Sequence, residues 1–298
     1  MARETELSPP GAQGWPFCAL VILLAAAGAL AIHIPNYLHQ DVAWLSWAAD
    51  RVIRGDVYGR DLLEVNPPLS MLVYVPAALL GRLVGLDLAI KLWIVFIAAV
   101  SMGLLWQTAE RRIRLPVIIA LGLFFVLAFP REFGQREQLA LLLTAPYVAG
   151  PARHRGLAVL SGVMAGIGFA LKPFFLIALL LVFITRRRIR TEEVAIAATG
   201  ALYAAGLLLF FQPWLTEMLP KAAAFYYGGS SSAVMLIVQL GFIVPAMVGI
   251  MWLVSAKQPG TQGFAMAAIG FTLAVILQNK GFAYHFVACF GFLALYLA

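Results

Sequence analysis

Charged residues are scarce in this chain of 298 residues: 12% are Asp, Glu, Lys or Arg, whereas 62% are hydrophobic. A soluble domain of this length carries roughly twice that share of charge. The scarcity therefore excludes an ordinary soluble domain and indicates an integral membrane protein. The net charge of +7 does not indicate nucleic-acid binding, because much of the excess Lys and Arg lies in short loops, where it orients a chain in the bilayer.

Several familiar signals are also missing. The two cysteines, Cys18 and Cys289, both lie inside apolar runs, which argues against a disulfide framework. The sequence has no His-Glu-x-x-His metal motif, no phosphate loop and no dinucleotide fingerprint. The first apolar run, from Trp15, lacks a basic segment before it and an obvious small-residue cleavage site, so it is expected to be a retained helix rather than a removed signal peptide. Any site must therefore be assembled from residues that are far apart in the sequence.

Long apolar runs are what the chain has instead, and about ten of them can enter a bilayer. They predict an all-α fold, a polytopic transmembrane helical bundle that forms a single domain over residues 1–298. The runs are 15–34, 88–108, 115–130, 138–150, 156–171, 173–185, 193–211, 233–254, 263–277 and 284–298.

Basic residues in the loops indicate the sides of this bundle, because loops rich in Lys and Arg stay in the cytoplasm. The basic groups are Arg111, Arg112 and Arg114; Arg153 and Arg155; Arg186, Arg187, Arg188 and Arg190; and Lys257. This places the N-terminus in the cytoplasm and makes residues 35–87 a large first periplasmic loop. The apolar run 67–85 is then a juxtamembrane or partly inserted helix on the outer face.

Residues 156–185 are expected to form two short helices that meet at Lys172 and Pro173. One long helix would place the second and third arginine groups on opposite faces, and proline disfavours helical geometry in the residue before it. Lys172 then lies at the outer side. An ammonium group between two apolar half-helices needs an anion or a water-filled cavity.

Asp41 begins the polar part of the first outer loop, before an amphipathic stretch in which Leu45, Ala48, Ala49 and Val52 recur at helical spacing. Two interpretations are open. Its carboxylate can cap the free N–H groups of the helix, or it can act as a general base that faces a cavity at membrane level.

Glu64 and Asn66 precede a pair of prolines that suits a helix start. The carboxylate of Glu64 can be another cap, or with Asn66 it can bind a cation or a sugar hydroxyl.

The turn between residues 129 and 137 contains Arg131, Glu132, Arg136 and Glu137. It is either a solvated turn or an arginine clamp for a phosphate, which guanidinium groups bind in bidentate geometry. In the last outer turn, Lys280 can bind a second phosphate oxygen. His285 can donate a hydrogen bond, ligate a metal or be purely structural.

Four blocks in this order resemble the GT-C glycosyltransferases, in particular the branch of the lipid A aminoarabinose transferases and protein O-mannosyltransferases. Asp41 with the helix that ends at Gly55-Asp56 is similar to the acidic motif of the family's first loop. The other blocks are Glu64-Val65-Asn66-Pro67-Pro68-Leu69, Gly166 to Pro173 with Lys172, and Lys280 to Tyr284. One departure is that Val65-Asn66 stands where the family has a lysine.

The resemblance implies transfer of a sugar from a polyprenyl-phosphate-sugar donor to a lipid or glycan acceptor at the periplasmic face of a bacterial inner membrane, by an inverting mechanism. It makes Asp41 the candidate base, with Glu64 as a second catalytic candidate. Candidates for the donor phosphate are Arg131, Arg136, Lys172 and Lys280, and candidates for other substrate contacts are Asn66, Glu137, Tyr284 and His285. A divalent metal ion is left open, with Asp41, Glu64 and His285 as its candidate ligands.

The alternative is a transporter or flippase of lipid-linked sugars, which would bind the same phosphate. Such proteins often contain internal repeats with matching broken helices. No clear repeat is visible in this sequence, which favours the transferase.

Overall fold

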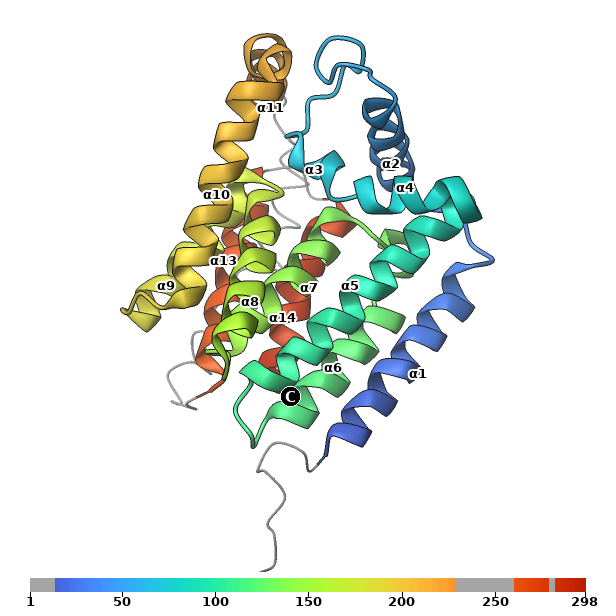
Figure 1. The fold of residues 1–298 in the computed structure, drawn as a ribbon. Coiled ribbons are helices and arrows are strands. Elements are labelled where there is room, and N and C mark those ends of the chain that lie inside the picture. The colour runs from blue at the N-terminus through green and yellow to red at the C-terminus, as the bar shows by residue number, and fades with distance from the viewer. Residues whose placement is uncertain (1–13, 229–259, 279–281) are drawn as a thin grey trace, which may run out of the picture.

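A computed structural model describes residues 14–228, 260–278 and 282–298, and over these residues the secondary structure is helical with no strand (Figure 1). The expected all-α bundle is therefore present. The expected run 233–254, Lys257 and Lys280 lie outside the described residues.

The main helices follow the apolar runs to within a few residues. They are α1 (Trp15–His33), α5 (Leu86–Thr108), α6 (Arg114–Leu127), α7 (Arg136–Ala149), α8 (Arg155–Ala170), α9 (Leu176–Arg186), α10 (Thr191–Phe210), α13 (Gln262–Gln278) and α14 (Val287–Leu297). Among the described helices, α1, α5 and α10 are long and apolar enough to cross a membrane by themselves. The others are shorter apolar helices, so the structure supports a helical membrane bundle without fixing the number of spans.

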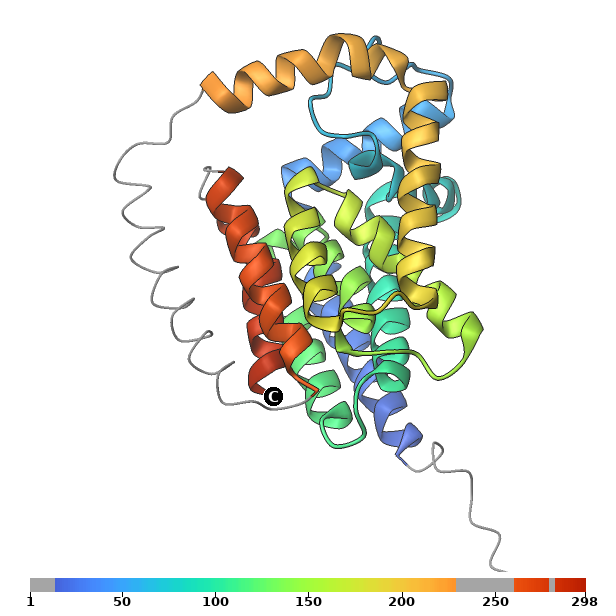
Figure 2. The ribbon, with the colours of Figure 1, turned by 90° about the vertical axis from the view of Figure 1, so that its left-hand side faces the viewer.

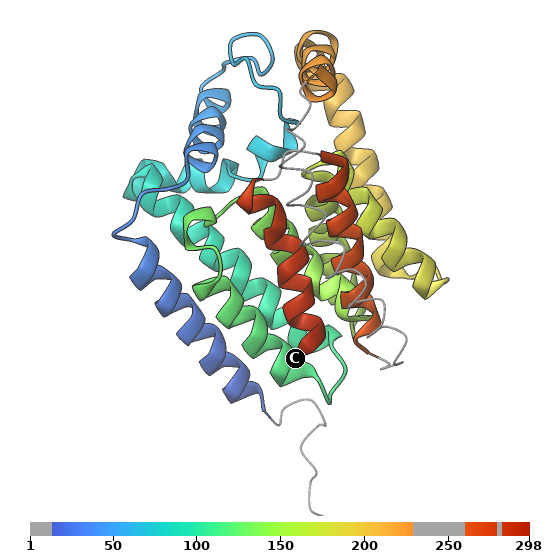
Figure 3. The ribbon, with the colours of Figure 1, turned by 180° about the vertical axis from the view of Figure 1, so that it is seen from behind.

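Helix α7 forms the centre of the bundle, and every residue from Arg136 to Ala149 is buried. It packs against α5, α8, α13 and α14. Figure 3 shows α13 and α14 side by side on the face opposite to that of Figure 1. Small residues allow close approach: a Cβ added at Gly270 of α13 would lie 2.3 Å from the Cα of Ala178 in α9.

One end of the bundle is covered by four helices, α2 (Gln40–Ile53), α3 (Leu69–Leu72), α4 (Val75–Val84) and α11 (Leu219–Gly228) (Figures 1 and 2). A short π-helical segment, Trp214–Met218, leads into α11. The run 67–85 was expected to form one helix on the outer face. It forms two, α3 and α4, which are separated at Val73 and Tyr74. Helix α2 is amphipathic, as expected, and buries Val42, Leu45, Ala48 and Ala49.

The arginine-containing turns lie at the other end. The α5–α6, α7–α8 and α9–α10 connections are all remote from α2 and α11 (Figures 1 and 2). The last two are joined directly, because the backbone N–H of Ala152 donates to Glu192 at 2.8 Å. The three described arginine groups thus share one end of the bundle, as the loop pattern predicts.

The predicted break at Lys172 and Pro173 is confirmed. Helix α8 ends at Ala170, a 3-10 turn covers Pro173–Phe175, and α9 follows. Lys172 itself has extended backbone geometry (φ −141°, ψ 138°), which is the conformation favoured before proline. The hydroxyl of Ser70 in α3 donates to the carbonyl of Leu171 at 3.0 Å, so the break lies directly beneath the covering helices.

Candidate functional site

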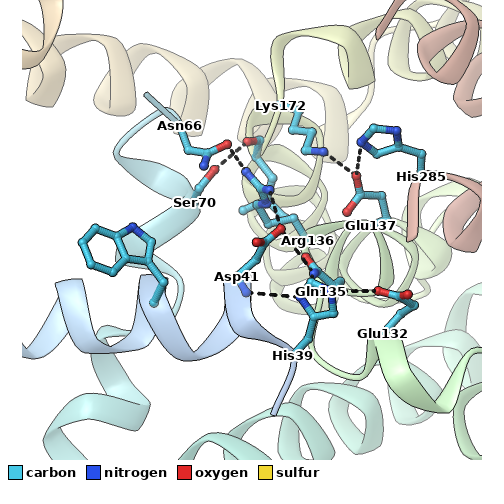
Figure 4. Close-up of polar contacts among 12 residues, drawn as sticks. His39, Asp41, Asn66, Ser70, Glu132, Gln135, Arg136, Glu137, Lys172 and His285 are labelled. Carbon is cyan, nitrogen blue, oxygen red and sulfur yellow. Dashed lines mark hydrogen bonds and ion pairs between the residues drawn. The ribbon is translucent and has the colours of Figure 1, made fainter. Parts of the chain in front are cut away.

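Polar side chains from five segments converge under the covering helices (Figure 4). The segments are the start of α2, residues 64–70, the turn before α7 with that helix's first turn, the α8–α9 break, and the 3-10 turn Ala283–Phe286 before α14. Each is the end of an apolar helix or the loop beside it. This convergence is what the sequence predicts for residues that lie on one side of a membrane.

Gly134 positions the first turn of α7. It has a φ of +80°, which strains any residue with a side chain, and an added Cβ would also displace the Cδ1 of Ile94, 2.4 Å away. Its carbonyl accepts from the hydroxyl of Tyr74 at 2.7 Å, and its N–H donates to Gln138 at 2.7 Å. The turn therefore directs Gln135, Arg136 and Glu137 toward the covering helices.

Arg136 is the central cation of this cluster. It is buried, donates to the Oδ1 of Asn66, and its Nη2 lies 3.9 Å from the Oδ2 of Asp41. Within the described residues, the buried atoms Arg136 Nε, Gln135 Oε1 and Glu137 Oε2 have no hydrogen-bond partner. Buried polar groups normally have partners, so three consecutive residues with unused bonding capacity distinguish this turn from ordinary packing.

Asp41 is not the cap of α2, and that interpretation is wrong. Helix α2 begins at Gln40, which places Asp41 inside the first turn, and the cap is His39, whose Nδ1 accepts from the N–H of Asp41 at 3.1 Å. The carboxylate is thereby left for other contacts. Its side chain is 32% exposed, and its Oδ2 lies 3.5 Å from the Nε2 of Gln135.

His39 and Glu132 form the edge of the cluster next to Asp41. The His39 Nδ1 is also 2.6 Å from the Nε2 of Gln135, and its Nε2 is 3.7 Å from Glu132 Oε2. Because Nδ1 accepts from the Asp41 N–H, the proton of a neutral ring lies on Nε2, toward Glu132. Burial raises the pKa of the Glu132 carboxyl, while His39 opposes that shift.

Lys172 and Glu137 form the other half of the cluster. Lys172 donates to Glu137 Oε1 and, at 3.2 Å, to Gln278, and both of its partners are buried. His285 Nε2 lies 3.9 Å from the same Glu137 oxygen. The ring centroid of Tyr284 is 5.3 Å from the Lys172 ammonium, within cation–π range. Of the two expectations for Lys172, an anion or a water-filled cavity, the protein itself supplies the anion, Glu137.

Glu64 closes the loop before α3. Its Oε1 accepts from both the backbone N–H and the side-chain Nδ2 of Asn66 at 2.7 Å, and its Oε2 accepts from the Nε1 of Trp44. The hydroxyl of Tyr58 donates to the Asn66 carbonyl at 2.9 Å. Glu64 therefore caps no helix. It fixes Asn66, which in turn presents its Oδ1 to Arg136.

Two phosphate candidates are not part of this cluster as described. Arg131 is exposed in the 3-10 turn Pro130–Glu132, without an ion pair to any described residue, and Lys280 lies outside the described residues. The three candidate metal ligands also do not come together: in the described part of the chain, no group of three His, Cys, Asp or Glu side chains could hold a metal ion. No chemical step is therefore assigned to a metal.

Sequence reasoning missed several members of the cluster, namely His39, Gln135, Gln278 and Trp44. The glutamines are neutral, so a search for charge in an apolar chain passes over them. Both do leave a signal, because Gln278 directly follows the apolar run 263–277 and Gln135 lies in the polar turn beside Arg136.

Comparison with protein families gives one match. The model of Glycosyltransferase family 87 matches residues 65–297, most of the chain. It includes Asn66, Arg136, Glu137, Lys172 and His285, whereas Asp41 and Glu64 precede its first residue. Comparisons with curated proteins and with solved structures gave no match. The family confirms the resemblance to GT-C enzymes, and it implies a sugar donor and an acceptor as substrates. The chain therefore belongs to glycosyltransferase family 87, a GT-C-like family of membrane glycosyltransferases.

Proposed function

We propose that this glycosyltransferase takes its sugar from a polyprenyl-phosphate-linked donor and transfers it, with inversion, to a lipid or glycan acceptor at the periplasmic face of the bacterial inner membrane. The observation that carries the proposal is the position of Asp41, a partly exposed carboxylate 3.9 Å from the buried guanidinium of Arg136. A base next to a phosphate-binding cation is the minimum that such a transfer requires.

In this mechanism Asp41 is the general base. The acceptor hydroxyl gives its proton to Asp41, and its oxygen forms a bond to the anomeric carbon. The bond from that carbon to the donor phosphate oxygen breaks on the opposite face, and the electron pair leaves with the polyprenyl phosphate. Exposure of Asp41 allows the acceptor to reach it, and its contacts with Gln135 and Arg136 hold the carboxylate in one orientation.

The departing phosphate is stabilised by groups around the start of α7. The Arg136 Nε faces no described hydrogen-bond partner. Lys172 has three N–H donors, of which two are used by Glu137 and Gln278. The positive end of the α7 dipole points to the same place. In the proposal, Arg131, which is exposed, and Lys280 contribute additional charge as the donor enters. Fixed donors of this kind are usually the largest contribution to such catalysis.

The remaining candidates have supporting roles in this proposal. Glu64 holds Asn66, and Asn66 orients Arg136 and contacts the sugar. Glu137 orients Lys172. Tyr284 and His285 line the substrate site from the turn that precedes α14. The orientation follows from the arginine turns at the opposite end, which favour the cytoplasm, with the N-terminus on that same side.

The test is sugar transfer by the purified full-length chain in lipid nanodiscs, with a panel of synthetic polyprenyl-phosphate sugars as donors and an envelope lipid extract as acceptor. We expect D41N to reduce transfer by at least about 100-fold, the scale of a lost general base. The matched control is D50N, on the same helix, because Asp50 pairs only with the exposed Arg54 among the described residues.

Unimpaired transfer by D41N would remove Asp41 as the base. Transfer from nucleotide sugars but from none of the polyprenyl donors would overturn the proposed donor class. Movement of labelled donor across liposomes without any transfer would favour the transporter alternative.

A further inference from the structure

A groove runs between α9 and α10, away from the polar cluster. Its volume is about 460 Å³. It is lined by Leu176, Leu179, Leu180 and Phe183 of α9 and by Glu193, Ile196 and Ala197 of α10. These positions recur at three- and four-residue spacing, so each helix contributes one continuous stripe. The groove is apolar along its length except for Glu193.

Arginines surround the Glu193 end of this groove. Arg190 contacts Glu193 at 3.3 Å, and Arg186 lies 3.9 Å from it while also donating to the carbonyl of Val148 at 2.8 Å. Arg187 and Arg188, in the turn itself, are exposed. Arg186, Arg187, Arg188 and Arg190 carry four positive charges, whereas Glu192 and Glu193 carry two negative charges, so this segment has a net charge of +2. The turn is therefore electropositive.

Two N–H groups in this turn have unused bonding capacity. The Nη1 of Arg186 and the Nε of Arg190 are buried and have no hydrogen-bond partner among the described residues. A buried N–H without an acceptor is uncommon. The turn therefore has guanidinium donors in excess of the acceptors that the described residues supply.

This region is separate from the proposed transfer site. Helix α10 has 20 residues, so it extends about 30 Å from the arginine turn, and it ends near α11, among the helices that cover Asp41 (Figure 2). A donor whose phosphate lies at Arg136 therefore cannot place the same phosphate at Arg187. The groove needs a different ligand.

We propose that the groove and the arginine turn bind an anionic phospholipid, with its phosphate at Arg187 and Arg188 and one acyl chain between α9 and α10. A phospholipid has both required parts, an anionic head and an apolar chain, in the order in which the turn and the groove present them. The groove and the helix surface beside it are apolar and open, since Leu180 in the groove is 54% exposed and Ile184 beside it is 50% exposed. The inference does not depend on the donor or on the catalytic base.

The first experiment tests the headgroup. The purified full-length chain is examined by native mass spectrometry after exchange into micelles that contain dioleoyl phosphatidylglycerol or dioleoyl phosphatidylcholine. We expect preferential retention of phosphatidylglycerol and about 25-fold weaker binding in R187Q/R188Q, on the scale of two arginines near a lipid surface. The matched control is R111Q/R112Q, which removes two exposed arginines from another turn at the same end.

The second experiment tests the groove. Ala197 lines it, whereas its exposed neighbour Ala198 does not. A197W should displace the retained phosphatidylglycerol, and A198W should leave it in place. Equal retention of both lipids, equal losses in the two arginine double variants, or unchanged binding in A197W would each overturn the proposal. Dimers that are lost in A197W would also overturn it, in favour of a second copy of the chain as the occupant.

Discussion

Lys172 and Glu137 form a buried ion pair between two segments that are 35 residues apart. Lys172 lies in the break between α8 and α9, and Glu137 lies in the first turn of the central helix α7. The pair therefore ties the break to the middle of the bundle. Glu137 is fully buried and Lys172 is 7% exposed, so neither charge can be solvated if the other is removed.

From this pair we expect K172M to lose about 3 kcal/mol of stability, because it leaves an uncompensated buried carboxylate. The double variant K172M/E137M should recover more than half of that loss. Thermal unfolding in detergent measures both, and R60Q, which breaks the exposed Arg60–Asp61 pair, should leave the unfolding temperature nearly unchanged, because exposed ion pairs contribute little to stability. Additive losses in the double variant would show that the two residues are not coupled.

The cap of α2 is the subject of a second prediction. His39 accepts from the N–H of Asp41, so H39A should lower stability by about 1 kcal/mol. H39N should retain most of it, because asparagine is itself a good cap. Transfer activity should fall in H39A, since the first turn that holds Asp41 is loosened. If H39A is destabilised but keeps full transfer activity, the His39 cap is not needed to position Asp41 as the base.

Asn66 gives a third prediction, through Arg136. N66A removes the acceptor of a buried guanidinium and should raise the KM for the lipid-linked donor by about 10-fold, equivalent to about 1.4 kcal/mol. The effect on kcat should be smaller. The control is N36A, because Asn36 is exposed and its side chain donates only to the carbonyl of Ile32, in the last turn of α1, among the described residues. A fall in kcat with an unchanged KM would contradict a role in donor binding.

Helix packing supplies a fourth prediction. In G270A the new Cβ would lie 2.3 Å from the Cα of Ala178, so α9 and α13 must separate, at a cost of about 1–3 kcal/mol. Gly200, in α10, has no atom within 4 Å of an added Cβ. G200A should therefore stabilise the chain by about 0.5–1 kcal/mol. Unfolding temperatures of the two variants should move in opposite directions, and equal shifts would refute this account of the contact.

The sequence predicts the parts of this architecture that depend on local chemistry. The break at Lys172 follows from the steric effect of Pro173 on its neighbour, and the shared end of the arginine turns follows from the cost of moving charge across lipid. The family resemblance, drawn from short motifs, was confirmed over residues 65–297.

The sequence does not predict which residues, far apart in the chain, pair with one another. Lys172 was expected to need an anion, but nothing in the chain indicated that Glu137 supplies it. A cap was one of the two interpretations of Asp41, because carboxylates are common caps, whereas the helix begins at Gln40 and the imidazole of His39 is the cap. The roles of the candidate site residues are still predictions, which the variants above are designed to test.

The complete burial of α7 has a consequence for motion. Arg136 and Glu137 belong to a helix that is enclosed on all sides, whereas Asp41 belongs to α2, on which Trp44 and Trp47 are each about 40% exposed. If the distance between Asp41 and Arg136 changes when substrates enter or leave, α2 must be the part that moves. Hydrogen exchange should then be faster over 40–53 than over 136–149, and only the former should slow when donor binds. Arg136, on α7, would then stay in place, and the site would open and close through movement of α2, which carries Asp41.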